Sequence, residues 1–237
     1  MEHDHSTEAI RSRLLAGPPI TYIRDWVYGG IDGTVTTFAI VASAIGANLS
    51  TRIILIMGIA NLIADGFSMA ASNYSGTKTE KDDHARLHAF EERQITADPE
   101  GERQEVREIF RIKGFTGEDL ERAVTIVTSD RKRWIETMLT EEYGMPAVLR
   151  SPTIAGASTF AAFLLCGAIP LIPFAAGLNA SPEISLVLTA LVFFGIGSTK
   201  SRWSLSAWWR SGFEIVAIGL SAAGLAFLVG HVLKNLL

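Results

Sequence analysis

Polar side chains recur at every fourth position within one apolar stretch of the chain. Asn61, Asp65 and Met69 have this spacing, which places them on one face of a helix. Carboxylate and amide oxygens suit divalent cations, and a thioether sulfur adds a preference for transition metals. Asp32 and Thr36, also four residues apart, predict a second such face in the preceding apolar stretch. We therefore interpret these five residues as a candidate path for a metal ion.

A purely structural role is the alternative for this series, which extends to Met57 and Asn73. Amides can hydrogen-bond across helices, and methionines can fill gaps in a helix bundle. The carboxylates are harder to explain in this way, because an ionised group is costly in hydrocarbon and marks a functional site by default. Asp32 follows Gly30 and precedes Gly33, so it could also lie at the membrane interface, where its burial would cost less.

The composition points to a membrane protein. Apolar residues make up 48% of the 237 residues, the mean hydropathy is +0.26, and the apolar residues are gathered in blocks. Each block is near the roughly 20 residues that a helix needs to cross about 30 Å of hydrocarbon. We predict five transmembrane helices, at 31–49, 53–73, 152–177, 184–200 and 212–233.

Several functional classes are disfavoured. The net charge of −4 and the lack of a basic block with interleaved aromatics argue against nucleic-acid binding. Cys166 is the one cysteine, so neither an intramolecular disulfide nor a CxxC metal site is possible. The first twenty residues lack the apolar core of a cleavable signal peptide. With no HExxH or GxSxG motif, we expect no enzyme and no prosthetic group.

A polar segment separates the second and third predicted spans. Residues 74–147 carry 29 of the 46 formal charges, and their apolar residues have helical spacing. Breaks at Pro99, Gly114 and Asp130 predict three short helices after a long helix that continues the second span. We predict four regions, namely a tail at 1–21, spans one and two within 22–73, a water-facing helical domain at 74–147, and spans three to five within 148–237.

Lysine and arginine set the expected orientation, because these residues resist translocation. Six of them flank the spans on the side of the N-terminus, and two, Arg52 and Lys234, lie on the other side. The N-terminus and the polar domain are therefore expected in the cytoplasm.

The polar domain contains a second collection of potential ligands. Carboxylates that converge from several helices are a common way for a helical bundle to bind metal ions. A solvated helix surface is the alternative, and it is also the simpler interpretation of His84 and His88. The glutamates concerned are Glu91, Glu92, Glu102, Glu105, Glu108, Glu141 and Glu142.

Four segments resemble the vacuolar iron transporter family. "RDWVYGGIDGTVTTFAIVASAIGA" resembles its first span and "GFSMAASNY" the end of its second, whereas "DPEGERQEVREIFRIKGF" and "DRKRWIETMLTEEYG" are similar to its cytoplasmic metal-binding domain. The resemblance covers about residues 22 to 235. It implies an all-α membrane protein with five transmembrane helices, a helical cytoplasmic metal-binding domain between the second and third, and a homodimer.

The resemblance also implies roles for particular residues. Asp32 and Met69 match the family's pore-lining carboxylate and thioether. The implied ligands of the cytoplasmic domain are Glu91, Glu102, Glu105, Met138 and Glu142. Departures occur at Asn61, where the family commonly has a glutamate for which Asp65 is a possible substitute, and at Gln94 and Leu139, where glutamate and methionine are usual. These departures bear on proton coupling and on metal preference.

The function expected from this resemblance is export of Fe2+, with Mn2+ as a second cargo, from the cytosol in exchange for protons. The expected location is the inner membrane in a bacterium or the vacuolar membrane in a eukaryote. The alternative is a membrane-anchored sensor or storage module that binds iron without moving it.

Overall fold

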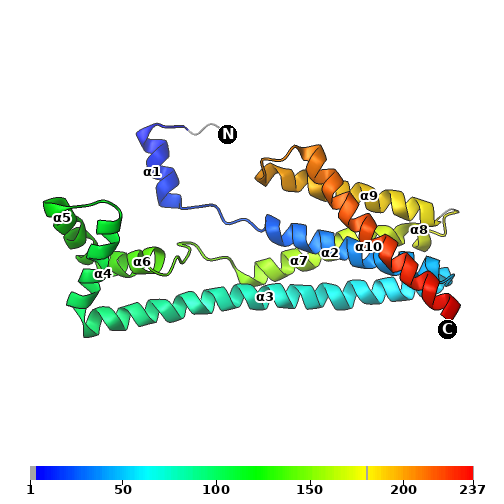
Figure 1. Ribbon diagram of the computed structural model, residues 1–237, viewed down its shortest axis with the longest axis horizontal. Coiled ribbons are helices and arrows are strands. Elements are labelled where there is room, and N and C mark those ends of the chain that lie inside the picture. The colour runs from blue at the N-terminus through cyan, green and yellow to red at the C-terminus, as the bar shows by residue number, and fades with distance from the viewer. Residues whose placement is uncertain (1–3, 180, 237) are drawn as a thin grey trace. The chain divides into compact units, whose positions relative to one another are not determined.

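The computed structural model describes residues 4–179 and 181–236, and all regular structure within them is helical. Figure 1 shows the elements in chain order. They are α1 (Thr7–Ala16), α2 (Ile23–Gly46), α3 (Thr51–Ala97), α4 (Pro99–Ile112), α5 (Gly117–Thr128), α6 (Arg131–Glu141), α7 (Pro152–Gly167), η1 (Ile169–Leu171), α8 (Ile172–Ala175), α9 (Ser181–Lys200), η2 (Ser201–Trp203) and α10 (Trp208–Leu236).

The chain forms two compact units, each with its own hydrophobic core. The apolar unit comprises Thr21–Gly76 and Pro152–Leu237, and the polar unit comprises Met1–Ile20 and Thr77–Ser151. Helix α3 contributes to both, because the boundary falls between Gly76 and Thr77.

Five helical segments of the described chain are long and apolar enough to cross a membrane, as predicted. They are Ile23–Gly46, Thr51–Ala97, Pro152–Ala175, Ser181–Trp203 and Trp208–Leu236. The first begins eight residues before the expected start at residue 31, so Asp32 lies inside α2 rather than at its mouth. Hydropathy missed this extension because it contains Arg24 and Asp25.

The third span is not one continuous helix, which corrects the prediction for 152–177. Helix α7 ends at Gly167, and the 3-10 turn η1 and the short helix α8 complete the span. Pro170 and Pro173 explain the interruption, since each lacks the N–H that an α-helix needs. The hydroxyl of Ser185 in α9 donates to the Pro170 carbonyl over 2.7 Å and so satisfies one buried acceptor.

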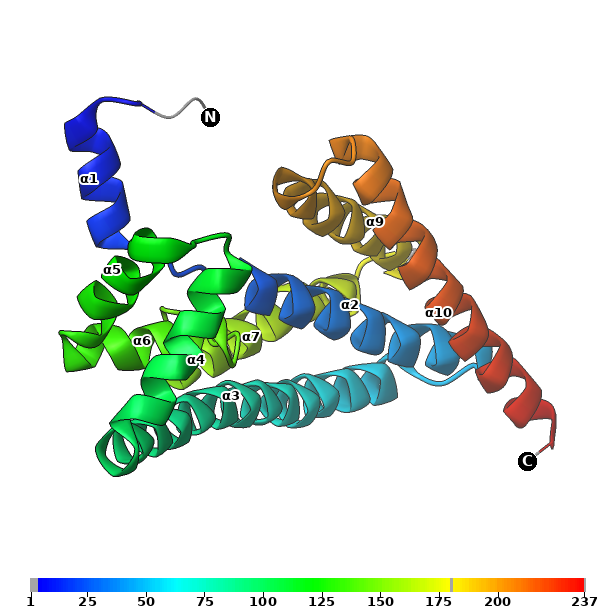
Figure 2. The same cartoon turned by 60° about the vertical axis from the view of Figure 1, so that its left-hand side comes forward.

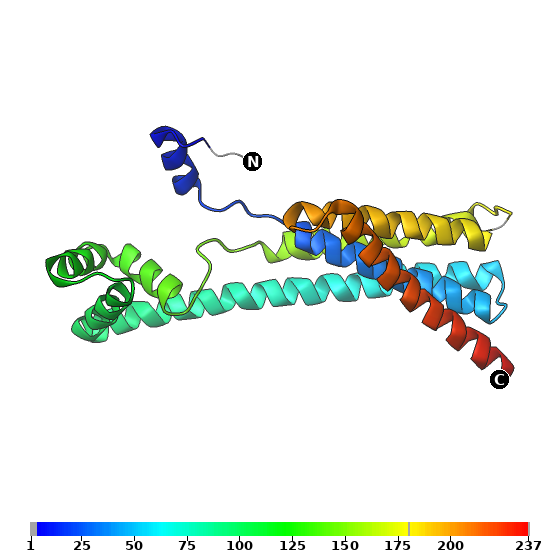
Figure 3. The same cartoon turned by 45° about the horizontal axis from the view of Figure 1, so that its top comes forward.

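Glycines bring α2 and α7 into backbone contact. A methyl group added to Gly33 would lie 2.5 Å from the carbonyl oxygen of Phe163, and one added to Gly167 would lie 2.6 Å from that of Gly33. Side chains normally hold helix axes about 8–10 Å apart, and small residues allow a closer approach. Helix α10 crosses α2 obliquely (Figure 3) and packs against it and against α9.

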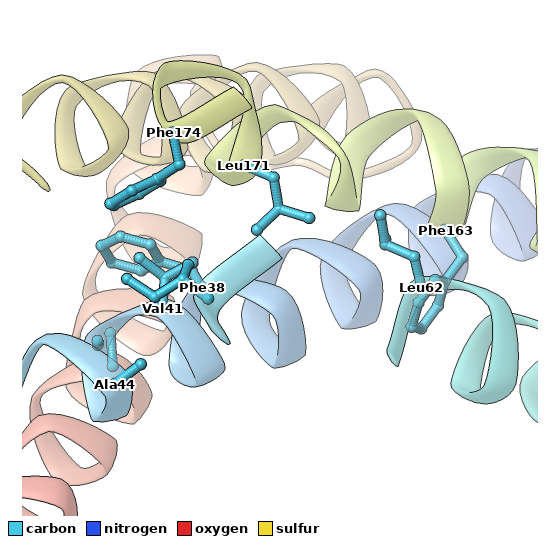
Figure 4. Close-up of a cluster of buried hydrophobic side chains, with 10 residues drawn as sticks. Phe38, Val41, Ala44, Leu62, Phe163, Leu171 and Phe174 are labelled. Carbon is cyan, nitrogen blue, oxygen red and sulfur yellow. The ribbon is translucent and has the colours of Figure 1, made fainter. Parts of the chain in front are cut away.

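The core of the apolar unit fills the space around these helices. Phe38 and Val41 of α2 face Leu171 and Phe174 of the interrupted third span, and Leu62 of α3 packs beside Phe163 of α7 (Figure 4). Phe163 and Val41 are fully buried. The outer surface of α3 is apolar as well, with Ile56, Ile63 and Phe67 at least 60% exposed, as suits a helix beside lipid or another helix.

A partly buried hydrogen-bond network joins three spans near the middle of α3, just before the unit boundary. The amide of Asn73 donates to Asp25 Oδ1 of α2 over 2.9 Å and to Thr159 Oγ1 of α7 over 2.7 Å. It also lies 3.2 Å from the Ala155 carbonyl. Because Asp25 is 1% exposed, its inclusion in α2 depends on such partners.

The polar unit contains the three predicted short helices, and the breaks fall where they were expected. Figure 2 shows α4, α5 and α6 gathered together. Asp98 caps α4 through the Gly101 N–H and Asp130 caps α6 through the Arg133 N–H. Gly114, with a φ of +94°, turns the chain between α4 and α5. Their core includes Val106, Leu120, Val124, Trp134, Ile135 and Met138.

The contact at Gly33 predicts a large response to a single methyl group. Gly33→Ala should destabilise the protein by about 1–3 kcal/mol, because the Phe163 backbone cannot move away as a flexible side chain could. Gly195→Ala is the matched control, since a methyl group there meets no atom within 4 Å. Thermal unfolding in detergent measures both, and equal midpoints for the two variants would contradict the close packing.

Candidate metal-binding sites

Asp32 and Asp65 form the acidic part of the site in the apolar unit. Asp32 is half-buried on α2, and Asp65 is exposed on α3. The two carboxylates are near enough for their negative charges to repel each other. Their proximity is a product of the fold, because 32 residues and a reversal of the chain separate them. A divalent cation would relieve this repulsion.

Thr36 and Asn61 connect the same two helices. The amide of Asn61 lies 3.4 Å from Thr36 Oγ1, and the Thr36 hydroxyl donates to the backbone carbonyl of Asp32 over 2.9 Å. Four of the five residues predicted to line an ion path thus come from α2 and α3, with Asn61 and Thr36 in contact between the helices and Asp32 and Asp65 interacting through their charges. Asn61 acts as a link between helices in this arrangement, as the structural alternative proposed.

The remaining members of the series are placed differently. Met69 is half-buried and packs against the hydrophobic core, so its sulfur lies beside that core. Met57 is 45% exposed. Asn73 points inward to Asp25 and Thr159, and its amide is already used. Equal spacing along α3 therefore does not give these side chains equal surroundings.

Glu91 and Glu102 are the buried part of the acidic cluster in the polar unit. Glu91 of α3 is 1% exposed and Glu102 of α4 is 6% exposed. The Oε2 atom of each is buried, and neither has a hydrogen-bond partner in the described chain. Buried carboxylate oxygens without partners are unusual, because an unpaired buried charge is costly.

Glu105 and Glu142 extend this cluster toward solvent. Burial, together with the charges of Glu91 and Glu105 and a side-chain hydrogen bond with Glu91, raises the pKa of Glu102 to about 7. Partial burial also raises the pKa of Glu105, with a contribution from Glu142, and that of Glu142, with a contribution from Glu91. These mutual effects show that all four predicted carboxylates share one electrostatic environment.

Met138, the predicted sulfur ligand, belongs to the same unit as the acidic cluster, as do Gln94 and Leu139, where the resemblance implies glutamate and methionine. Met138 is fully buried in the core of the polar unit, beside Leu139, which is 3% exposed. Leu139 replaces the usual methionine with another apolar side chain and so preserves the packing. Gln94 is exposed on α3.

The chemistry of the cluster fits a divalent cation, although its side chains are not yet closed around one. No group of three or more His, Cys, Asp or Glu side chains meets the geometry of a metal site in residues 4–179 and 181–236. Like charges that repel one another favour such an open arrangement. The unpartnered Oε2 atoms of Glu91 and Glu102 are available to a cation, which would remove the cause of the repulsion.

Two residues near these sites were not found from the sequence. Tyr143 donates its hydroxyl to Glu91 Oε1 over 2.9 Å, and burial together with this hydrogen bond raises its pKa. Its position after Glu142 was the available signal. Asp25 precedes the predicted start of the first span, so hydropathy alone does not mark it as a buried carboxylate.

His84 and His88 are not part of the acidic cluster. They line a separate cavity of about 500 Å³ together with Lys113, Lys132 and Arg133. Glu136 and Glu141 line it as well and pair with Lys132 and Lys113, whereas none of the four clustered glutamates lines the cavity. The interpretation of the histidines as polar helix surface is therefore preferred.

The raised pKa of Glu102 predicts a pH-dependent stability. The folded protein holds this proton up to about pH 7, whereas the ordinary pKa is 4.5. Protonation of Glu102 therefore contributes fully to the free energy of unfolding below the ordinary pKa of 4.5. This contribution is lost as the pH rises through the pKa of the folded protein. Without metal, the thermal midpoint of the wild type should fall more steeply than that of Glu102→Gln between about pH 5 and about pH 8.

Glu121→Gln is the control for this measurement. The hydrogen bond from Arg107 lowers the pKa of Glu121, so this group titrates below the pH range in question. In Glu121→Gln, the thermal midpoint should therefore change with pH as steeply as it does in the wild type. Parallel curves for the wild type and Glu102→Gln would refute the raised pKa.

Known proteins resemble the chain over most of its length. Vacuolar iron transporter 1 of Arabidopsis thaliana is 32% identical over 235 residues, which cover 98% of this chain and 92% of that protein. The vacuolar iron transporter of Toxoplasma gondii is 32% identical, with 90% and 74% covered, and that of Plasmodium falciparum is 29% identical, with 88% and 81% covered. These relatives are named as transporters and not as enzymes. A profile of the VIT family matches residues 23–231, and the chain therefore belongs to the VIT family.

Proposed function

We propose that the protein transports divalent transition-metal ions, with Fe2+ as the main cargo and Mn2+ as a second, out of the cytosol. The observation that carries this proposal is the pair of interacting carboxylates, Asp32 and Asp65, on two neighbouring apolar helices. Structural hydrogen bonding does not require two negative charges at such a place, whereas a passing cation does. The names of the relatives support iron as the cargo.

The cation would exchange its hydration water for protein oxygens within the apolar unit. Asp32 and Asp65 supply charge, Thr36 and Asn61 supply neutral oxygens, and Met69 offers a softer sulfur ligand one turn beyond Asp65. This mixture favours Fe2+ over Mg2+ or Ca2+, which prefer oxygen alone. Protonation of a carboxylate weakens its hold on the cation, which is the basis for the proposed exchange of metal for protons.

The acidic cluster of the polar unit would collect the cargo. Glu91, Glu102, Glu105 and Glu142 carry more negative charge than their surroundings tolerate, as the raised pKa values of the last three indicate. Binding of a cation there displaces protons and removes the repulsion. Met138 is the proposed sulfur ligand, and it would need to turn from the core toward the carboxylates.

The exposed position of Asp65 supports a homodimer. Asp65 shares the outer surface of α3 with Ile63 and Phe67, which are 60% and 68% exposed. A carboxylate that faces lipid is costly. A second copy of the chain against this surface would shelter Asp65 from lipid and would enclose the ion path between two protomers.

The proposed orientation places the N-terminus and the polar unit in the cytoplasm. It is based on the excess of lysine and arginine beside the spans on that side. The vacuolar relatives suggest a vacuolar membrane in a eukaryotic cell, and the inner membrane is the corresponding location in a bacterium.

Metal flux into liposomes tests the transport function. The wild type should move Fe2+ faster in the presence of a pH gradient. Asp32→Asn removes a proposed ligand and should reduce the flux by about tenfold or more, since loss of even an outer partner of a metal ligand has an effect of that size. Glu183→Gln, which alters an exposed carboxylate at the start of α9, should leave the Fe2+ flux unchanged.

Two outcomes of this assay would overturn the proposal. Wild-type flux from Asp32→Asn would remove Asp32 from the ion path. Tight Fe2+ binding without any flux would instead support a membrane-anchored sensor or storage module.

A further inference from the structure

Tyr143 links two carboxylates that come from different elements. Its hydroxyl donates to Glu91 Oε1 on α3 over 2.9 Å, and it also lies within hydrogen-bonding reach of Glu142, which precedes it at the end of α6. The hydrogen bond leaves Glu91 Oε2 buried and without a partner in the described chain. One oxygen of this carboxylate therefore accepts from Tyr143, and the carboxylate also interacts with the neighbouring side chain of Glu102.

The fold holds the Tyr143 ring in place independently of any ligand. The ring packs against the hydrophobic core of the polar unit. Helix α6 ends at Glu141, and Gly144 has a φ of +64°, which lets the chain reverse directly after the tyrosine. The reversal is secured by the Met145 N–H, which donates to the Leu139 carbonyl over 2.9 Å. The phenol is thus presented to Glu91 by a rigid helix end.

We propose that Tyr143 positions Glu91 and thereby determines which metal the acidic cluster prefers. The hydrogen bond uses one lone pair of Oε1 and fixes the carboxylate, so Glu91 favours binding a cation through Oε2 alone. The inference rests on the proposed function, since it assumes that this cluster binds the cargo. Tyr143 contacts the carboxylate and is itself no ligand.

The number of oxygens that a carboxylate offers discriminates between cations. Ca2+ takes six to eight oxygen ligands at about 2.3–2.6 Å and often binds both oxygens of a glutamate. Smaller transition-metal ions accept fewer ligands and combine oxygen with sulfur, such as that of the buried Met138. A Glu91 restricted to one oxygen therefore disfavours Ca2+ more than Mn2+ or Fe2+. Partners of this kind typically change metal affinity by about 10–100-fold when they are removed.

Tyr143→Phe in the full-length protein in detergent tests this role, because it removes the hydroxyl and keeps the ring. Mn2+ and Ca2+ are titrated separately by calorimetry. The Mn2+ affinity should fall about tenfold, and the Ca2+ affinity should stay the same or rise, so that the ratio of the two affinities falls. The absorption spectrum of bound Co2+ should also change, since it reports the coordination geometry. Tyr28→Phe, on an exposed ring of the apolar unit, should change neither.

The outcomes separate this inference from the proposed function. A Tyr143→Phe protein with an unchanged ratio, or with an equal loss for both ions and a lowered thermal midpoint, would assign Tyr143 a structural role alone and overturn the inference. Glu102→Gln serves as the reference variant. If Glu102→Gln left Mn2+ binding intact, the cluster would not be the metal site, and the proposed capture of cargo would fail as well.

Discussion

Backbone contact between α2 and α7 is the constraint on which the apolar unit depends. Gly33 and Gly167 remove the side chains that would hold these helices apart, and the Phe163 backbone occupies the space. With one side of α2 closed in this way, the adjacent Asp32 lies within range of the negative charge of Asp65 on α3. The same packing holds α2 deep in the unit, so its polar residues must find partners within the protein.

The polar groups of the apolar unit differ in how they are satisfied, and this difference separates structural from functional candidates. Asn73 makes hydrogen bonds to Asp25 and Thr159, and Asn61 lies beside Thr36, so both amides connect helices. Asp32 and Asp65, in contrast, bring two negative charges together. An arrangement that is unfavourable without a ligand is the stronger indication of a binding site.

The polar unit also holds negative charges close together without a ligand. Its short helices are capped and share a hydrophobic core, which supports Glu91 and Glu102 in positions removed from solvent. The cost of burying these carboxylates appears as the raised pKa of Glu102, and it is offset in part by the hydroxyl of Tyr143. Binding of a cation there would relieve a repulsion between carboxylates that the fold already imposes.

The sequence alone determined the helical class, the five spans, the three short helices of the polar unit and the residue types of both sites, because hydrophobic period, helix breakers and charge are local properties. It could not place the start of α2, since burial of Asp25 depends on distant helices. The break after Gly167 had a local signal in Pro170 and Pro173, which the hydropathy of the segment obscured. Only the tertiary structure decided that Asn73 turns inward, that Asp65 stays exposed beside Asp32, and that Tyr143 reaches Glu91. Those relations join residues from separate elements, and spacing along a chain carries no information about which neighbours a side chain meets across a helix interface.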